Sequence, residues 1–581
     1  MPVTRPDTSR TARRAGARAI SVLVIVAIVV IAFVVRLVDI QVVSAATYTD
    51  EAKDRRALEA TVYGTRGDIL DTNGQVLADS VERYDITVSP RVALGYTDMN
   101  GPVEPYLAGI ASVTGQSVAE LDATLRADPD SDYAVLSKGL TLDEYLAVHE
   151  LGIPWVIGVR VPGRTYPNGA IAGNIVGFLG TDEPLAGIEQ MMDQCLAGQD
   201  GLVSYERGAD GVRLPDTEVV EVDAVDGADV TLTIDRDLQW TVMERLAAGV
   251  SMTGAEWGQA IVVRIADGAI MSLADWPTFD PNEFQTATVT GSRAFTTPYE
   301  PGSIMKPITF ALLLDQRAMA PETPVDATWI QDYGEGGTLY DFGWHPADLT
   351  AAGVLAISSN TGTANLAQLI PDELRRQYML NFGLGDVTDV HFPGESAGIL
   401  GEYWDERTRL NVSFGAGIAT TIMQIAGAYV GIGNDGLRLP LKLVENCTYP
   451  DGTVVEPERA EPIQVIDQYA AHTTIDLMEG VQAYYLGTGT DVDLPGYRLA
   501  VKSGTATVAE GGVYGDKSTV SYVGLAPAED PEYIVVTSLG LPYGGTSDLA
   551  APVMRDIMSH TLTRYRVPPS TGERTHYSLY W

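Results

Sequence analysis

The sequence has little positive charge for its length. Its 581 residues include 38 lysines and arginines against 77 aspartates and glutamates, which gives a formal net charge of −39 at pH 7. A protein this acidic repels phosphate groups, so the composition argues against nucleic acid as a partner. The charge affects solubility and does not indicate a particular chemistry.

Cysteine and histidine are also scarce. The two cysteines are Cys195 and Cys447, and the six histidines are scattered at positions 149, 345, 391, 472, 560 and 576. Because no spacing typical of metal ligands occurs, the sequence predicts no metal site and no cofactor. The cysteines could form one disulfide outside the cell or remain two buried thiols, and we favour the thiols.

The sequence lacks internal repeats and low-complexity segments, and it has one long hydrophobic run. Its 45% hydrophobic and 20% charged residues are typical of a globular protein. A chain of 581 residues is too long for a single core. We therefore expect two or three domains.

The hydrophobic run lies near the N-terminus and follows a basic flank. Residues 1–18 hold five arginines and one aspartate, and the uncharged run from Ala19 to Val35 ends at Arg36. Continued to Ile40, the segment is long enough to cross a bilayer. The arginines place the N-terminus in the cytoplasm and the rest of the chain on the far side of the membrane.

A cleaved signal peptide is the alternative to a retained anchor, because the small residues Val43-Ser44-Ala45 resemble a cleavage site. The apolar run is longer than in most signal peptides, and the charged Arg36 and Asp39 interrupt it. A buried core helix is a further alternative, which the arginine cluster disfavours. We favour a retained membrane anchor.

The region after the hydrophobic run has a mixed α/β pattern without a catalytic grouping. An Asn-Gly turn between alternating segments predicts a hairpin within residues 66–78. Acidic helical patterns follow near residues 105–127 and 141–151. We interpret residues 41–225 as a scaffold.

The sequence pattern of the C-terminal half predicts a sheet with helices packed on it. Asp235 is placed to cap an amphipathic helix, and residues 260–274 form two apolar strands around Asp267-Gly268. Further strands are expected at 497–507, 518–526 and 532–539, followed by a helix at 550–564 and a loose tail at 566–581. This order indicates an α+β fold with an antiparallel sheet.

Ser303 is a candidate nucleophile, in the segment Pro301-Gly302-Ser303-Ile304-Met305-Lys306. If a helix starts here, the Lys306 amine can reach the Ser303 hydroxyl, because positions i and i+3 share a helix face. Lys306 can act as a base only if its pKa is lowered. Taken alone, this spacing is common and usually marks an ordinary helix start with a solvated lysine.

Two further motifs favour the catalytic interpretation. Ser358-Ser359-Asn360 lies downstream of the serine motif, and Lys502-Ser503-Gly504-Thr505 lies nearer the C-terminus. Ser-x-x-Lys, Ser-x-Asn and Lys-Ser-Gly in this order occur in penicillin-binding proteins and class A β-lactamases. Three short motifs in order are far more specific than one.

With these motifs the chain resembles a class B penicillin-binding protein over nearly its whole length. The other matching segments are Arg-Gly-Asp-Ile-Leu-Asp-x-Asn-Gly-x-x-Leu-Ala at 66–78, Arg164-Thr165-Tyr166-Pro167, Gly187-Ile188-Glu189, Phe392-Pro393-Gly394-Glu395, residues 413–418, and Ala551-Pro552-Val553. Thr72, Asn174 and Ala416 depart from the usual family residues, which are arginine, histidine and glutamine. These departures leave the three catalytic motifs intact.

The resemblance implies a domain order. Residues 1–18 would form a cytoplasmic tail and 19–40 a single membrane helix. An elongated pedestal of the dimerisation type would span 41–225. Residues 226–565 would form a penicillin-binding transpeptidase domain with a serine β-lactamase-like fold, and 566–581 a tail.

The resemblance also implies peptidoglycan D,D-transpeptidation. Ser303 would attack the D-Ala-D-Ala end of a stem peptide, release D-alanine and hold the acyl group as an ester. Lys306 would take the serine proton, Ser358 would pass a proton to the leaving amine, and Asn360 would hold the substrate amide. A β-lactam would mimic D-Ala-D-Ala and stall at the ester.

The third motif would bind the substrate. Lys502, with Ser503 and Thr505, would attract the terminal carboxylate, and Gly504 would let the strand edge lie close to the peptide. Backbone N–H groups of Ser303 and Thr505 would form the oxyanion hole.

Other functions share some of these motifs. Glu395 could suggest a deacylating base as in class A β-lactamases, but the Phe-Pro-Gly-Glu loop explains it better as a structural residue. A D,D-carboxypeptidase and a β-lactam-binding scaffold without cross-linking activity remain alternatives. A β-lactam sensor is disfavoured, because it would couple the domain to a sizeable cytoplasmic part and only about 18 residues precede the hydrophobic run. We favour a transpeptidase of the septal, cell-division type over the elongation type.

The resemblance implies partners as well. These are peptidoglycan stem peptides on lipid-linked precursor strands, β-lactam antibiotics, and a membrane glycan polymerase of the SEDS family. We expect the membrane helix and the membrane-proximal pedestal, including Arg66–Ala78 and Arg164–Gly169, to contact the polymerase. The alternative is that Arg66 and Arg164 only hold the pedestal together.

Overall fold

The computed structural model describes residues 8–45, 47–48, 57–180, 183–206, 216–288, 291–510 and 513–581. Residues 1–7 of the predicted cytoplasmic tail lie outside the described residues. The chain divides into two units, one formed by Met1–Gly64 with Gln199–Val225, and the other by Thr65–Gly198 with Asp226–Trp581.

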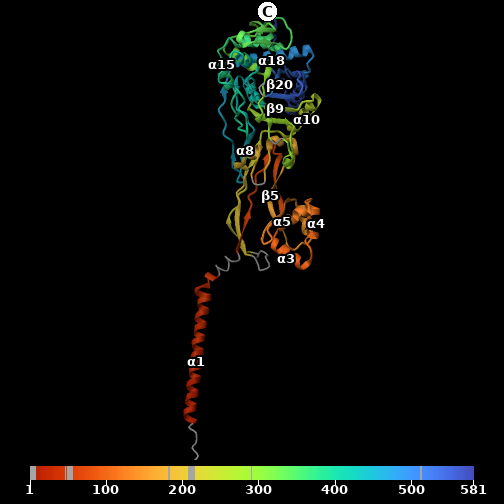
Figure 1. Ribbon diagram of the computed structural model, residues 1–581. Coiled ribbons are helices and arrows are strands. Elements are labelled where there is room, and N and C mark those ends of the chain that lie inside the picture. The colour runs from red at the N-terminus through yellow and green to blue at the C-terminus, as the bar shows by residue number, and fades with distance from the viewer. Residues whose placement is uncertain are drawn as a thin grey trace, which may run out of the picture. The chain divides into compact units, whose positions relative to one another are not determined.

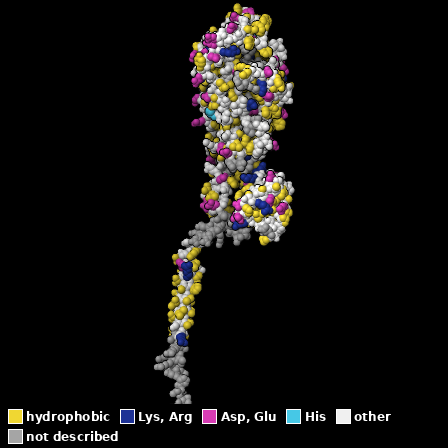
Figure 2. All heavy atoms as spheres, viewed as in Figure 1, with side chains coloured by type: hydrophobic (Ala, Val, Ile, Leu, Met, Phe, Trp, Pro, Cys, Tyr) yellow, Lys and Arg dark blue, Asp and Glu magenta, His cyan; other side chains and the backbone are white. Residues whose placement is uncertain are grey.

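The first unit contains the hydrophobic run and a small sheet. The run lies in α1 (Thr8–Val38), which continues into a π-helical turn, η1 (Asp39–Val43). Its span Arg18–Val43 is long and apolar enough to cross a membrane, and hydrophobic side chains cover the helix in Figure 2. The sheet has the order β1-β6-β7, with β1 at Ala57–Val62, β6 at Gly201–Glu206 and β7 at Val219–Val222.

The second unit begins with a seven-stranded sheet that joins both halves of the sequence. Its order is β17-β16-β8-β2-β3-β4, and β5 also pairs with β3. The strands are β2 (Ile69–Leu70), β3 (Val76–Val88), β4 (Ala134–Leu140), β5 (Val156–Thr165), β8 (Asp229–Leu232), β16 (Val444–Thr448) and β17 (Val454–Val455). The predicted Asn-Gly hairpin is confirmed between β2 and β3, where Gly74 has φ +75°.

Four helices pack beside β3 and β4 around a small core. They are α3 (Pro90–Asn100), α4 (Glu104–Thr114), α5 (Val118–Arg126) and α6 (Leu142–Glu150). Ser117 and Glu120 form a capping box at the start of α5, and Thr141 and Glu144 form one at α6. The helical patterns predicted for 105–127 and 141–151 are therefore confirmed.

The two cysteines form a disulfide, so the expectation of two buried thiols is wrong. Cys195 lies in α9 (Asp193–Leu196) and Cys447 in β16. Helix α9 contacts β8, and β8 pairs with β16, which brings the two Cα atoms to 6.3 Å. The bond connects segments 252 residues apart, and the spacing of the cysteines gave no sign of this pairing.

Arg66 and Arg164 are buried around a carboxylate rather than exposed to a partner. Arg66 Nε lies 2.8 Å from Glu189 Oε2, and Arg164 Nε lies 2.6 Å from Glu189 Oε1. The exposed fractions of the side chains are 12% for Arg66, 4% for Arg164 and 0% for Glu189. This burial supports the alternative that both arginines hold this part of the fold together. Their contact with a polymerase stays a prediction.

We expect Glu189→Gln to destabilise the protein, because the buried Arg164 loses its carboxylate and Arg66 keeps only its pair with Asp193. Breaking a buried ion pair in this way costs about 3–5 kcal/mol. Thermal unfolding of the full chain in detergent measures the effect. The control is Asp122→Asn, which breaks the exposed Arg126–Asp122 pair on α5 and should cost about 0.3–0.5 kcal/mol. Equal losses in the two variants would contradict this account of Glu189.

The C-terminal half is organised around a five-stranded antiparallel sheet of order β10-β9-β21-β20-β19. Figure 1 labels β9 and β20 of this sheet. The strands are β9 (Trp257–Arg264), β10 (Ala269–Trp276), β19 (Ala500–Glu510), β20 (Val513–Ala526) and β21 (Tyr533–Leu541). The predicted strands and the antiparallel α+β arrangement are confirmed.

Helices cover both faces of this sheet. Helices α10 (Arg236–Thr253) and α19 (Ala551–Arg564) pack together on one face, while α17 (Ile422–Gly433) and α18 (Gln468–Thr488) pack on the other. Neighbouring residues of β20 show the two faces, because Gly524 approaches Met554 of α19 and Leu525 approaches Gly433 of α17. As predicted, Asp235 caps α10 with its side chain.

Short elements connect these layers. The short strands are β11 (Pro324–Asp326), β12 (Ile330–Asp332), β13 (Thr338–Tyr340), β14 (Asp348–Thr350), β15 (Leu437–Arg438) and β18 (Ile463–Gln464). The helices are α7 (Gly173–Val176), α8 (Gly187–Met191), α11 (Arg293–Thr296), α12 (Lys306–Asp315), α13 (Ala351–Ile357), α14 (Asn360–Ala367), α15 (Asp372–Asn381) and α16 (Thr408–Asn411).

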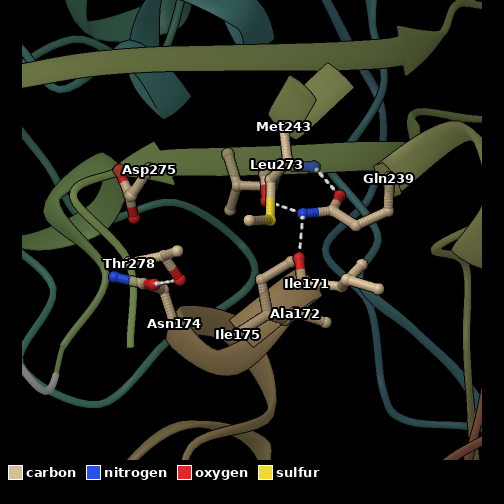
Figure 3. Close-up of a pocket in the computed structure, with 9 residues that line it drawn as sticks. All are labelled: Ile171, Ala172, Asn174, Ile175, Gln239, Met243, Leu273, Asp275 and Thr278. Carbon is tan, nitrogen blue, oxygen red and sulfur yellow. Dashed lines mark hydrogen bonds between the residues drawn. The ribbon is translucent and has the colours of Figure 1, made fainter. Parts of the chain in front are cut away.

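A polar contact region joins residues 171–175 to α10 and β10 (Figure 3). The Gln239 side-chain amide donates to Ile171 O at 3.1 Å and to Leu273 O at 2.7 Å. Asn174 accepts a hydrogen bond from Thr278 Oγ1 at 2.5 Å and donates to Gly291 O at 2.8 Å. Both ends of the asparagine amide are therefore satisfied.

The C-terminal end is docked, so the expectation of a loose tail is wrong there. Leu579 O accepts from Thr350 N at 3.0 Å, and Ser578 O accepts from Thr350 Oγ1 at 2.5 Å. A Cβ atom on Gly353 would lie 2.0 Å from Leu579 O, so only glycine fits beneath the tail. The tail therefore packs at the start of α13.

Candidate active site

The Pro301-Gly302-Ser303 segment lies against strand β19. A 3-10 turn, η4 (Gly302–Met305), precedes α12, so the α-helix begins at Lys306 rather than at the serine. Gly302 has φ +58°, and a Cβ atom there would lie 2.7 Å from Thr505 O. Glycine therefore allows the turn to approach the strand, and it brings the backbones of Ser303 and Thr505 close together.

Lys306 is fully buried, and its amine contacts the second motif. The Nζ atom donates to Ser358 O, lies 3.1 Å from Ser358 Oγ and lies 2.9 Å from Asn360 Oδ1. Ser303 is half-buried, and no hydrogen bond between its hydroxyl and Lys306 is found among the described residues. The sequence predicted that direct contact, whereas the structure directs the amine to Ser358 and Asn360.

The second motif forms a sharp turn between two helices. Helix α13 ends at Ile357, and the next residue, Ser358, has φ +67°. Ser359 caps α14 by accepting a hydrogen bond from Gly362 N. Because residues other than glycine rarely adopt a positive φ, the surrounding contacts must hold the Ser358 backbone in place. This turn places the Ser358 hydroxyl toward the lysine side chains.

Lys502 approaches the same hydroxyl from strand β19. Its Nζ atom lies 2.9 Å from Ser358 Oγ, 3.1 Å from Tyr485 OH and 2.9 Å from Ser503 O. Tyr485 OH also lies 2.6 Å from Ser503 Oγ. Sequence reasoning missed Tyr485, because it lies inside the long helix α18 and belongs to none of the three motifs.

The two buried amines differ from ordinary lysines in their affinity for protons. Burial lowers the pKa of Lys306 well below its usual value, and the charge of Lys502 lowers it further. Burial lowers the pKa of Lys502 to about 7. Ser358 Oγ lies between the two amines and can accept from one while it donates to the other. The arrangement can therefore take up and relay a proton.

The third motif lies on an open strand edge. Strand β19 is the last strand of the five-stranded sheet, and its inner side pairs with β20 from Lys502 opposite Val523 to Thr505 opposite Val520. A Cβ atom on Gly504 would lie 2.7 Å from Pro301 O, so a side chain at this position would push the strand away from η4. The free edge can pair with an extended peptide.

Glu395 is confirmed as a structural residue. Its carboxylate accepts hydrogen bonds from Thr388 N at 3.0 Å, Thr388 Oγ1 at 2.7 Å and Phe392 N at 3.3 Å. Burial raises its pKa. Since these bonds close the loop that contains it, Glu395 is not placed as a deacylating base.

Two family models, one for each of two domains, together match most of the chain. Residues 258–559 match the penicillin binding protein transpeptidase domain, and residues 61–184 match the penicillin-binding protein dimerisation domain. The penicillin-binding protein PbpB of Mycolicibacterium smegmatis is 32% identical, over 94% of this chain and 90% of that protein. The peptidoglycan D,D-transpeptidase FtsI of Escherichia coli is 29% identical, over 93% and 91%.

Solved structures agree with these matches. A peptidoglycan synthetase from Bifidobacterium adolescentis has a TM-score of 0.73 and 33% identity, with 90% of this chain and all of that chain covered. Penicillin binding protein 3 from Mycobacterium tuberculosis, complexed with aztreonam, has a TM-score of 0.68 and 27% identity, with 88% and 98% covered.

Proposed function

The chain belongs to the class B penicillin-binding proteins, and on this premise we propose that it is a peptidoglycan D,D-transpeptidase whose acyl-enzyme forms on Ser303. The observation that carries the assignment is the Ser358 hydroxyl held between two buried amines beside the Ser303 turn. The fold, with its dimerisation and transpeptidase domains, agrees with this activity.

Acylation begins when Ser303 Oγ attacks the carbonyl carbon between the two D-alanines, and its proton passes to neutral Lys306. The N–H groups of Ser303 and Thr505 stabilise the resulting oxyanion. As the amide bond breaks, the Ser358 hydroxyl gives a proton to the leaving D-alanine amine and is reprotonated by a neighbouring lysine. The stem peptide remains as an ester on Ser303.

Substrate binding involves the remaining motif residues. The stem peptide pairs with the free edge of β19, and Asn360 donates to its amide. Lys502, Ser503 and Thr505 bind the terminal carboxylate, and Gly504 keeps the strand close to η4. In the second half-reaction an amine of a neighbouring stem attacks the ester, forms the cross-link and releases Ser303. A β-lactam would acylate Ser303 in the same way.

The function is tested with a donor peptide ending in D-Ala-D-Ala and an amine acceptor, with products identified by mass spectrometry. We expect D-alanine release together with a donor–acceptor amide. Release of D-alanine with hydrolysed donor alone would identify a carboxypeptidase. Penicillin labelling without any D-alanine release would identify a β-lactam-binding scaffold.

We propose a septal role for the protein, because the relatives that match more than nine-tenths of the chain include FtsI. A fluorescent fusion of the full chain would then gather at the division site. Uniform side-wall fluorescence would favour the elongation type instead.

We also propose the topology and the domain limits. The basic residues before the span Arg18–Val43 support a cytoplasmic N-terminus and an extracytoplasmic catalytic domain. We assign residues 41–225 to the pedestal and 226–565 to the transpeptidase domain, limits that contain both family matches. Protease added to intact protoplasts would then cut the C-terminal domains and spare an N-terminal tag.

A membrane glycan polymerase is the proposed partner of this protein. A class B protein does not polymerise glycan, so we propose that it works with a SEDS-family polymerase through its membrane helix and nearby residues. Exchanging residues 19–40 for an unrelated apolar helix should lower co-purification and glycan synthesis at least about tenfold, while penicillin labelling persists. Equal polymerase activity with and without this protein would contradict the partnership.

A further inference from the structure

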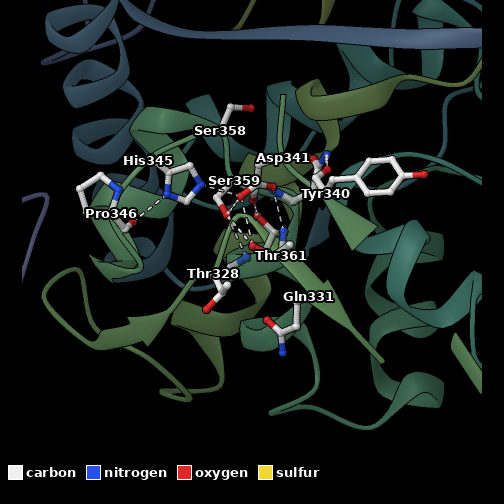
Figure 4. A network of polar contacts seen from close by, with 12 residues as sticks. Thr328, Gln331, Tyr340, Asp341, His345, Pro346, Ser358, Ser359 and Thr361 are labelled. Atoms are coloured by element: carbon white, nitrogen blue, oxygen red, sulfur yellow. Dashed lines mark hydrogen bonds and ion pairs between the residues drawn. The ribbon is translucent and has the colours of Figure 1, made fainter. Parts of the chain in front are cut away.

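Asp341 packs against the turn that carries Ser358 and Asn360, and the reaction steps leave it without a role. Asp341 directly follows β13, and its side chain is 3% exposed. The carboxylate accepts from Ser359 Oγ at 2.6 Å, from Thr361 Oγ1 and Thr361 N at 3.1 Å, and from Asn360 N. Figure 4 shows Ser359 and Thr361 gathered at Asp341, while Ser358 points away from them.

His345 completes the network from the other side. Its Nε2 atom lies 2.7 Å from Asp341 Oδ2, and its Nδ1 atom lies 2.8 Å from Pro346 O. The contact with Pro346 fixes the ring so that Nε2 faces the carboxylate. The aspartate is therefore held between an imidazole ring and the start of α14.

These bonds fix the residues that follow the strained Ser358. Ser358 has φ +67°, and the three residues after it all bond to Asp341. Asn360 is held a second time, because its side chain donates to Tyr340 O at 3.2 Å. Without the carboxylate, the turn loses the contacts that keep Ser358 Oγ and Asn360 Oδ1 at the Lys306 amine.

We propose that Asp341, oriented by His345, is a positioning residue for acyl transfer that keeps the Ser358 hydroxyl between the amines of Lys306 and Lys502. The proposal rests on the proposed function, since it presupposes acylation of Ser303.

The carboxylate also affects the charge of the site. Burial and the charge of Lys502 lower the pKa of Lys306, and the negative charge of Asp341 opposes them. The other titratable groups that face this cluster are His345 and Tyr333 on the Asp341 side and Tyr485 beside Lys502. Loss of the Asp341 charge should lower the pKa of Lys306, so the base becomes neutral at lower pH.

The test measures the second-order rate of acylation by a fluorescent penicillin, as a function of pH, for the full chain in detergent. Asp341→Ala should lower the rate roughly 10- to 100-fold, because a small misplacement of reacting groups has effects of that size. Asp341→Asn keeps an oxygen acceptor for the backbone, so it should retain most of the acylation rate. The rising limb of its pH–rate profile should lie at lower pH than in wild type. The control Glu335→Gln removes an exposed carboxylate on η5 (Gly334–Gly336) and should change neither.

The outcomes separate this proposal from the proposed function. Wild type that takes no label would contradict the acyl-enzyme itself. If wild type is labelled, an Asp341→Ala rate within about twofold of it, or an Asp341→Asn limb at the wild-type pH, would overturn the role of Asp341. If Asp341→Ala does not fold, the pH profile of Asp341→Asn decides.

Discussion

Ser303→Ala is expected to abolish covalent penicillin labelling while the protein stays folded and bound to the membrane. The substitution removes the oxygen that forms the ester, and loss of a catalytic serine lowers turnover by roughly 10⁶-fold. Ser303 is half-buried on η4, and the hydroxyl has no hydrogen bond to Lys306, so its loss leaves the packing of the turn unchanged. Intact-mass analysis after penicillin treatment measures the adduct.

The matched control is Ser251→Ala, which removes an exposed hydroxyl on α10. This variant should gain one penicillin mass, as wild type does. A full adduct on Ser303→Ala would mean that another residue is the nucleophile.

Lys306→Arg should lower acylation at least about 100-fold, which is the usual contribution of a general base. Arginine stays protonated and cannot accept the serine proton. The lysine is suited to this task because burial and Lys502 lower its pKa. The wild-type rate should therefore rise with pH as Lys306 loses its proton, at a pH well below 10.5.

Lys306→Met is the second variant, since it keeps a long side chain but carries no charge into the buried site. Both substitutions should lose acylation, whereas Lys138→Arg on the exposed part of β4 should not. Stopped-flow measurement of acylation gives the rates. A normal rate in both Lys306 variants would assign the base to Lys502 acting through Ser358.

Local signals in the sequence were sufficient to predict the capped helix α10, the Asn-Gly hairpin and the three motifs. Asp235 at the start of α10 and the Asn-Gly turn before β3 act through neighbouring backbone groups, so their effects can be read locally. The three motifs likewise came together, with Ser358 in contact with both lysines.

Features that depend on distant pairing were not visible in the sequence. Cys195 and Cys447 pair because β8 lies between their elements, and no local pattern encodes that strand order. Asp341 reaches the site from a loop and Tyr485 from the last turn of α18. Their roles depend on burial and on the directions of side chains, which only the folded chain shows.

The most direct measurement of the central claim uses a substrate peptide rather than an antibiotic. The full-length protein is mixed with a donor ending in D-Ala-D-Ala, quenched in acid, digested and mapped by mass spectrometry. We expect an ester on the peptide that contains Ser303, with the mass of the donor less one D-alanine. An ester on any other residue, or release of D-alanine with no ester at any time, would contradict the account.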